Sequence, residues 1–104
     1  MSYMANELER VLVRLYIEKT LLEKEIVVYD SVCEYLYKNY KCYLEECYEH
    51  PEYLVNALKE ICGDESVDII LSIQNDLEEF HRYGRIAIFL DTLDNVVYTW
   101  PKKA

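Results

Sequence analysis

Glycine and proline are scarce in this chain of 104 residues, with two of each, and the first fifty residues contain neither. These two residue types mark most tight turns, so their scarcity favours long helices over a sheet of many short strands. It also argues against the glycine-rich loops that cradle phosphates or dinucleotides, because those loops need several glycines close together. The composition therefore points to a helical fold and away from a nucleotide-binding enzyme.

Long apolar runs are missing as well. The longest are Ile26 to Tyr29 and Ile86 to Leu90, whereas a membrane-spanning helix needs roughly 20 apolar residues and a secretory signal roughly 7–15. Hydrophobic residues make up 52% of the chain and charged residues 30%, which is typical of a globular protein. We therefore expect one soluble domain over residues 1–104, beginning at its own Met1 and located in the cytoplasm.

Positive charge is in short supply: 11 Lys and Arg residues face 20 Asp and Glu residues, and the formal net charge is −9. Such a field repels the phosphates of nucleic acids and favours basic partners. The basic residues form isolated pairs, which are Arg10 with Arg14, Lys38 with Lys41, Arg82 with Arg85, and Lys102 with Lys103. Nucleic-acid binding is therefore disfavoured, and a basic protein is the partner that charge alone would select.

The clearest helix signal lies between His50 and Gly63. Pro51 suits the first turn of a helix, where its missing N–H is not needed. Apolar residues follow at Leu54, Leu58 and Ile61, on one helical face, and Gly63 can adopt the left-handed conformation that ends a helix. The spacing predicts a helix over residues 51–62.

Three further helices follow from the same periodicity, over residues 2–24, 24–40 and 65–83. In the first, one apolar stripe is expected to face the core: Leu8, Val11, Leu12, Leu15 and Leu22. In the second, a short strand at residues 26–28 is the alternative, and one continuous helix is favoured. Residues 41–50 are predicted to connect this second helix to the helix over residues 51–62, with a short helical turn at Leu44 to Tyr48. The fourth would start after a cap at Asp64 and end at Gly84.

The segment 85–100 fits two structures. As a helix it carries an unbroken apolar stripe. As a β-hairpin, residues 86–90 would pair with residues 96–100 around a turn at residues 91–95. The β-branched and aromatic content favours the hairpin narrowly. The fold expected is therefore a mainly α bundle of about four helices, followed by a hairpin or a fifth helix.

Four cysteines and one histidine are the candidates for a disulfide or a metal site. They are Cys33, Cys42, Cys47, Cys62 and His50. Their spacing is looser than that of zinc sites, which pair two short ligand clusters. Free thiols that serve as small core hydrophobes are the favoured interpretation, with a disulfide as the alternative. We expect no metal and no cofactor.

No group of residues has the pattern of a catalytic site. Glu78 and His81 have the spacing of one arm of a di-iron site, but such sites use that pair twice. The carboxylates of residues 45–52 fit a solvated loop better than an acid–base pair, because acid–base catalysis needs positioning and a shifted pKa. The chain is therefore expected not to be an enzyme.

Tyrosine is unusually frequent: there are eleven, and seven of them lie between Tyr29 and Tyr53. One helix cannot bury all of these rings on a single face. Tyrosine is favoured at protein interfaces because it combines a large ring with a polar tip. The residues assigned to an interface are Tyr29, Tyr35, Tyr37, Tyr40, Tyr43 and Trp100. Core packing and base stacking are the competing uses of the rings.

The segment EYLYKNYKCYLEECYEHPEYLVNALKEICGDESVDIIL, within residues 27–77, resembles a small archaeal helical domain. That domain occurs at the output ends of thaumarchaeal signalling proteins and in stand-alone crenarchaeal or archaeal-virus proteins. In this segment, as in that domain, a helix ending in an aromatic residue is followed by a polar connection, a Pro-initiated helix and a further helix after a glycine. The resemblance implies a regulatory or adaptor role and no catalytic residues.

The function expected from these observations is a non-enzymatic protein-interaction or regulatory module, acting as a homodimer. A winged-helix-like DNA-binding regulator is the first alternative, with residues 85–100 as its β wing. An acidic inhibitor that mimics nucleic acid and blocks a basic protein is the second.

Overall fold

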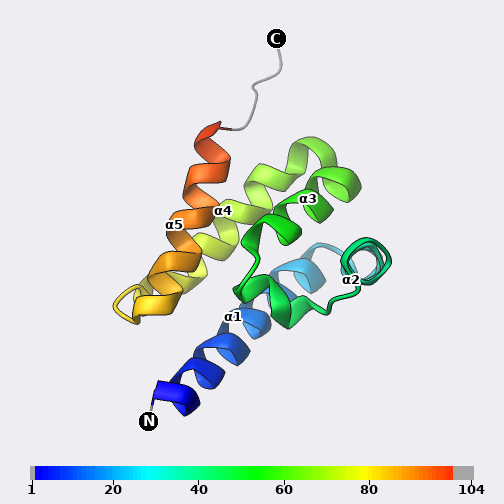
Figure 1. Ribbon diagram of the computed structural model, residues 1–104. Helices are drawn as coiled ribbons and strands as arrows, with labels where there is room; N and C mark the ends of the chain where they lie inside the picture. The colour runs from blue at the N-terminus through cyan, green and yellow to red at the C-terminus, as the bar shows by residue number, and fades with distance from the viewer. Residues whose placement is uncertain (1, 100–104) are drawn as a thin grey trace.

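The computed structural model describes the backbone of residues 2–99 and the side chains of residues 7–95, and the regular secondary structure of these residues is all helical. The α-helices are α1 (Ser2–Lys24), α2 (Ile26–Tyr40), α3 (Pro51–Cys62), α4 (Ser66–Leu77) and α5 (Gly84–Thr99) (Figure 1). Short 3₁₀ turns η1 (Leu44–Tyr48), η2 (Gly63–Glu65) and η3 (Glu78–Phe80) connect them. The predicted mainly α bundle is confirmed. Within residues 2–99, no helix is long and apolar enough to cross a membrane.

The chain turns sharply between α1 and α2 at one residue, Glu25, whose backbone is extended (φ −165°, ψ 148°). Figure 1 looks almost along the axis of α2, whereas α1 runs across the view. The continuous helix predicted over residues 24–40 is confirmed as α2, which starts at Ile26. It ends at Lys41, which takes the left-handed conformation (φ 55°, ψ 38°) and donates its backbone N–H to the carbonyls of Leu36 and Tyr37.

The Pro-initiated helix is also confirmed as α3, and the predicted turn at Leu44 to Tyr48 is η1. Gly63 ends α3 with φ 57° and ψ −121°, a conformation that glycine adopts far more readily than other residues. The fourth helix is shorter than predicted, because α4 stops at Leu77 and a 3₁₀ turn brings Phe80 against the ring of Tyr16 (5.8 Å between centroids). The N-cap residue of this helix is Glu65, whose side chain makes no capping hydrogen bond, and not the predicted Asp64.

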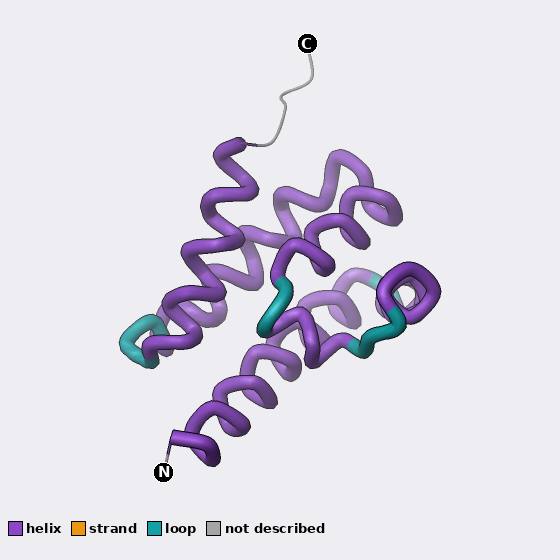
Figure 2. The backbone as a smooth tube through the Cα atoms, viewed as in Figure 1, coloured by secondary structure: helices purple, strands orange, loops and turns teal. Residues whose placement is uncertain are grey.

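The preferred hairpin at residues 85–100 is wrong, since residues 84–99 form α5 and no strand occurs among residues 2–99 (Figure 2). The reason lies in Leu93, which a hairpin would have placed in an exposed turn. In α5 it is fully buried together with Ile86, Phe89 and Leu90, which lie seven, four and three residues before it on one face. Burial of four large apolar side chains outweighs a local preference for strand.

The core lies where the five helices meet, and α1 contributes only one of its faces to it. Val13, Ile17 and Leu21 are buried there, together with Thr20, whose hydroxyl donates to the carbonyl of Tyr16 (2.9 Å). Of the stripe predicted to face the core, Leu8, Val11, Leu15 and Leu22 are exposed on the opposite side of α1, whereas Leu12 packs against the core. Both faces carry apolar residues at helical spacing, so periodicity alone could not distinguish them.

The two glycines allow a direct test of whether the positive φ of Gly63 requires glycine at the end of α3. Gly63→Ala places a Cβ on a residue with positive φ, and should lower the free energy of unfolding by roughly 1–2 kcal/mol. Gly84→Ala lies at the start of α5, where a Cβ meets nothing within 4 Å, and should leave stability unchanged or raise it by up to about 1 kcal/mol. Urea unfolding of both variants measures the difference; equal effects would contradict this account.

Candidate interaction surfaces

The predicted interface tyrosines Tyr29, Tyr35, Tyr37 and Tyr40 lie on α2, and Tyr43 directly precedes η1; Tyr40 packs on Tyr53 of α3, which was not among those predicted. The rings of Tyr40 and Tyr53 stack with centroids 3.9 Å apart and planes 5° apart, and His50 also stacks on Tyr53, with centroids 4.6 Å apart. Asn56 Nδ2 donates a hydrogen bond to the Tyr40 hydroxyl (3.0 Å). These three rings therefore form a small stack whose inner faces are already occupied.

Tyr35 and Tyr29 are also tied into the fold. Tyr35 contacts Tyr40 edge-on at 6.2 Å. The hydroxyl of Tyr29 donates to Glu18 Oε2 at 3.1 Å, which links α2 to α1. Burial, with Cys33 and Glu18 nearby, raises the pKa of Tyr29 to about 12. Both residues are half-buried and serve the packing between helices.

Tyr37 and Tyr43 are the exceptions, because both are exposed. Their rings lie 5.9 Å apart, and Lys41 Nζ sits over the Tyr37 ring at 5.3 Å from its centroid. The sixth residue of the predicted interface, Trp100, lies outside the described residues. Of the predicted interface tyrosines, Tyr29, Tyr35 and Tyr40 thus pack within the fold, and Tyr37 and Tyr43 form one exposed pair.

The outer face of α1 is a larger apolar surface, formed by Leu8, Val11, Leu15 and Leu22. Their exposed fractions are 70%, 41%, 48% and 43%. Ile26 and Val27, at the corner between α1 and α2, are exposed as well. Among the side chains of residues 7–95, these six account for more than half of the eleven large hydrophobic residues that stand exposed. Monomeric proteins rarely leave so continuous an apolar face open.

Charged side chains flank this face and hold α1 against its neighbours. On one side Arg10 Nε lies 3.3 Å from Glu49 Oε1, and Arg14 Nη1 lies 3.1 Å from Glu18 Oε1. Arg10 and Arg14 also approach Glu45, at 3.6 and 4.0 Å. On the other side Lys19 lies between Glu23 (3.1 Å) and Asp76 (3.6 Å). The apolar face is therefore bounded by charges along both edges.

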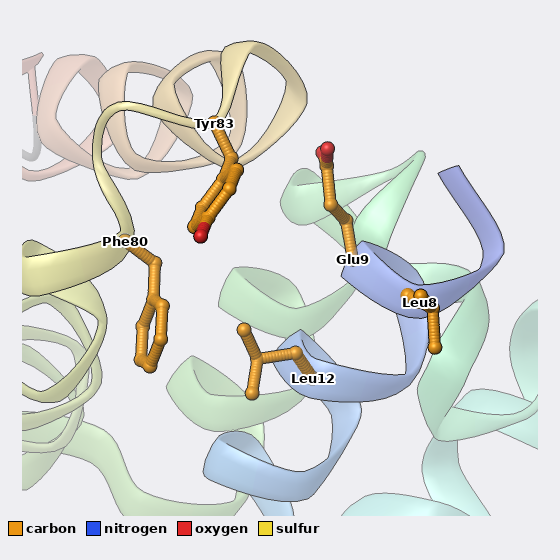
Figure 3. Close-up of a pocket in the computed structure, with 5 residues that line it drawn as sticks. All are labelled: Leu8, Glu9, Leu12, Phe80 and Tyr83. Atoms are coloured by element: carbon orange, nitrogen blue, oxygen red, sulfur yellow. The ribbon is translucent and has the colours of Figure 1, made fainter. Parts of the chain in front are cut away.

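A groove of about 270 Å³ opens beside the N-terminal half of this face (Figure 3). Leu8 and Leu12 of α1 line one side of the groove, and Phe80 and Tyr83, from the connection between α4 and α5, line the other. Glu9 borders it and accepts a hydrogen bond from the hydroxyl of Tyr48 (2.8 Å). Burial, and next the hydrogen bond to Glu9, raise the pKa of Tyr48. The groove is mostly apolar and continuous with the outer face at Leu8.

The four cysteines are free thiols in the structure. Cys42 and Cys47 are buried, and Cys33 and Cys62 are half-buried. Burial raises the pKa of all four thiols, which lowers the fraction of reactive thiolate at neutral pH. His50 is stacked on Tyr53. In the part of the chain that the structure describes, no three His, Cys, Asp or Glu side chains are placed to hold a metal ion.

The carboxylates considered for acid–base chemistry have structural partners. Glu45 and Glu49 pair with the arginines of α1, and Glu46 Oε1 accepts the backbone N–H of Tyr43 at 2.6 Å, which starts η1. Glu78 and His81 are both exposed, at the start of η3 and just after its end. The contacts of Glu45 and Glu49 therefore hold the η1 region against α1, and the contact of Glu46 stabilises the start of η1.

Comparison with protein-family models, with curated proteins and with solved structures finds no match for this chain. The geometry of the surfaces is therefore the basis for any functional inference.

The sequence indicates the outer face of α1 as an apolar stripe, but the assignment of that stripe to the core is wrong. The signal that could have identified it is the second apolar set on the same helix, Val13, Ile17 and Leu21. A helix with two opposite apolar faces can bury one in its own fold and leave the other for a partner.

The stack of rings makes a prediction about stability. Tyr53→Ala removes the central ring between Tyr40 and His50, and should lower the free energy of unfolding by roughly 2–3 kcal/mol, through lost burial and two lost ring contacts. Tyr43→Ala, at an exposed ring, should change it by less than about 0.5 kcal/mol. Thermal or urea unfolding distinguishes the two, and similar losses would show that the stack has no structural role.

The raised pKa of Tyr29, to about 12 against the ordinary 10.0, makes a prediction about pH. The folded state favours the neutral phenol, so this contribution to stability is complete below pH 10 and is lost as the pH rises toward 12. Tyr29→Phe should therefore make the free energy of unfolding less dependent on pH in that window. Urea unfolding between about pH 9 and 12 tests it; an unchanged slope in the variant would refute the assignment.

Proposed function

We propose that this chain is a non-enzymatic protein-interaction module that acts as a homodimer through the outer face of α1. The observation that carries the proposal is the exposed apolar row Leu8, Val11, Leu15 and Leu22 on the side of α1 opposite the core. The helices of the described chain pack on the other side of α1, so within one copy this row stays open to a partner.

The energy available from this face is consistent with a reversible dimer. Full burial of an aliphatic side chain is worth roughly 1.5–3 kcal/mol, and these residues are about half exposed, so each contributes on the order of 1 kcal/mol. With four such residues on each of two copies, the gross gain is about 8 kcal/mol before Ile26 and Val27 are added. Because association itself costs at least about 4 kcal/mol, the net gain from these residues is roughly 4 kcal/mol, which corresponds to a dissociation constant in the millimolar range, and the dimer depends on concentration.

The free thiols support a location in the cytoplasm. Four free thiols fit a reducing compartment, where disulfides are rare.

The winged-helix alternative loses its motivation, because residues 84–99 form α5 and supply no β wing. The exposed residues of α3 include Glu52, Asn56 and Glu60, which suit a DNA major groove poorly. The net charge of −9 keeps a basic protein as a second candidate partner, and such binding should weaken as salt rises.

The test is the solution mass, measured by light scattering over a range of concentrations with and without reductant. The wild-type chain should approach twice its 12.5 kDa at high concentration in both conditions. Leu15→Glu places a charge in the middle of the face and should weaken association at least about tenfold, because an unpaired charge would have to be buried.

Ile88→Glu is the matched control, because Ile88 is exposed but lies on α5, outside this face. It should associate like the wild type. A wild-type chain that stays monomeric at millimolar concentration would refute the proposal, and so would an equal loss in both variants.

A further inference from the structure

The outer face of α1 has different shapes at its two ends. Near Leu8 it borders the groove lined by Leu12, Phe80 and Tyr83. Beyond Leu22 lies the corner between α1 and α2, where Ile26 and Val27 are among the most exposed aliphatic residues of the described chain. When two copies run in opposite directions, each end of the face meets the other end of its partner.

We infer that two copies associate through antiparallel α1 helices, related by a two-fold axis that passes at Leu15. The inference rests on the proposed homodimer and specifies its geometry. Leu8 and Leu22 each lie seven residues from Leu15, or about 10.5 Å along the helix. Antiparallel pairing therefore brings Leu8 against the partner's Leu22, Leu22 against the partner's Leu8, and the two Leu15 side chains together.

This pairing places the C-terminal end of α1 of one copy at the groove of the other. The partner's Leu22 meets Leu8 at the rim of the groove, and beyond it the partner's chain turns at Glu25 into α2. Because the arrangement is symmetric, both grooves and both C-terminal ends of α1 are used at once, as an isologous interface requires.

The charges beside the face also favour antiparallel pairing of the two α1 helices. Leu8, Leu15 and Leu22 repeat every seven residues, so Arg14 and Lys19 take the flanking positions that meet across a parallel pair. A parallel dimer would therefore bring Arg14 near the partner's Lys19, and Glu18 near the partner's Glu18, with like charges together.

In the antiparallel dimer Arg14 approaches the partner's Glu18, and Glu18 approaches the partner's Arg14. The two Arg14 side chains also come near each other at the axis, but each then has a Glu18 beside it from both chains. Within one chain this pair is already in contact, at 3.1 Å between Arg14 Nη1 and Glu18 Oε1. Two arginines and two glutamates would thus alternate across the axis, and their charges balance.

The experiment is cross-linking between two variants, Leu8→Cys and Leu22→Cys, mixed and oxidised mildly, then analysed on non-reducing gels and by mass spectrometry. The mixture should give mainly the disulfide that joins position 8 of a Leu8→Cys chain to position 22 of a Leu22→Cys chain. Each variant oxidised alone should give little, because in the antiparallel dimer its two introduced thiols lie about 21 Å apart.

Two controls remove other sources of cross-links. Wild-type chains measure the background from the four native thiols. The mixture of Leu22→Cys with Ile88→Cys pairs an introduced thiol on the face with one on α5 and should stay at that background.

Three outcomes count against these assignments. A self-linked Leu8→Cys dimer would overturn the inference in favour of a parallel pair. So would a dimer by light scattering whose Leu8→Cys and Leu22→Cys mixture stays unlinked. A monomer by light scattering would instead refute the proposed homodimer itself.

Discussion

Burial of the inner face of α1 is the interaction on which the rest of the structure depends. Val13, Ile17 and Leu21 are buried on this face, and η1, α2, α4 and α5 all contact the helix. Each of these side chains contributes roughly 1.5–3 kcal/mol on burial. With no sheet among residues 2–99, α1 acts as the common support around which the later elements are placed.

The packing of η1 on α1 also brings polar side chains of the two elements into contact. Cys47 and Tyr48 are buried from η1, while acidic side chains in and just after the turn reach Arg10 and Arg14 of α1. Exposed ion pairs of this kind each contribute at most about 1 kcal/mol. They orient η1 and α1 relative to each other more than they stabilise the fold. The hydrogen bond from Tyr48 to Glu9 ties the same turn to the N-terminal half of α1.

Aromatic and aliphatic side chains have different roles in this chain: the tyrosines mainly pack within the fold, and the exposed aliphatic residues of α1 form the surface proposed for association. Most of the tyrosines on α2 and α3 find partners within their own chain, and the stack of Tyr40, Tyr53 and His50 uses their faces. The aliphatic row on α1 is left exposed by the described side chains, which is why it carries the proposed function. Tyrosine can satisfy both a ring contact and a hydroxyl contact within a small domain, whereas leucine gains only from being covered.

Local sequence by itself determined the helical character, the Pro-initiated helix and its glycine end, and the short turn at residues 44–48, because these follow from nearest-neighbour backbone preferences and spacing. Two features depended on the tertiary structure. Residues 84–99 are helical because Leu93 is buried against other helices, although their composition favoured strand. The inner and outer faces of α1 have similar apolar patterns, and only the packing of α2, α4, α5 and η1 decides which one is covered. Periodicity records that a face is apolar, but burial depends on which neighbours reach it, and that is a property of the folded chain.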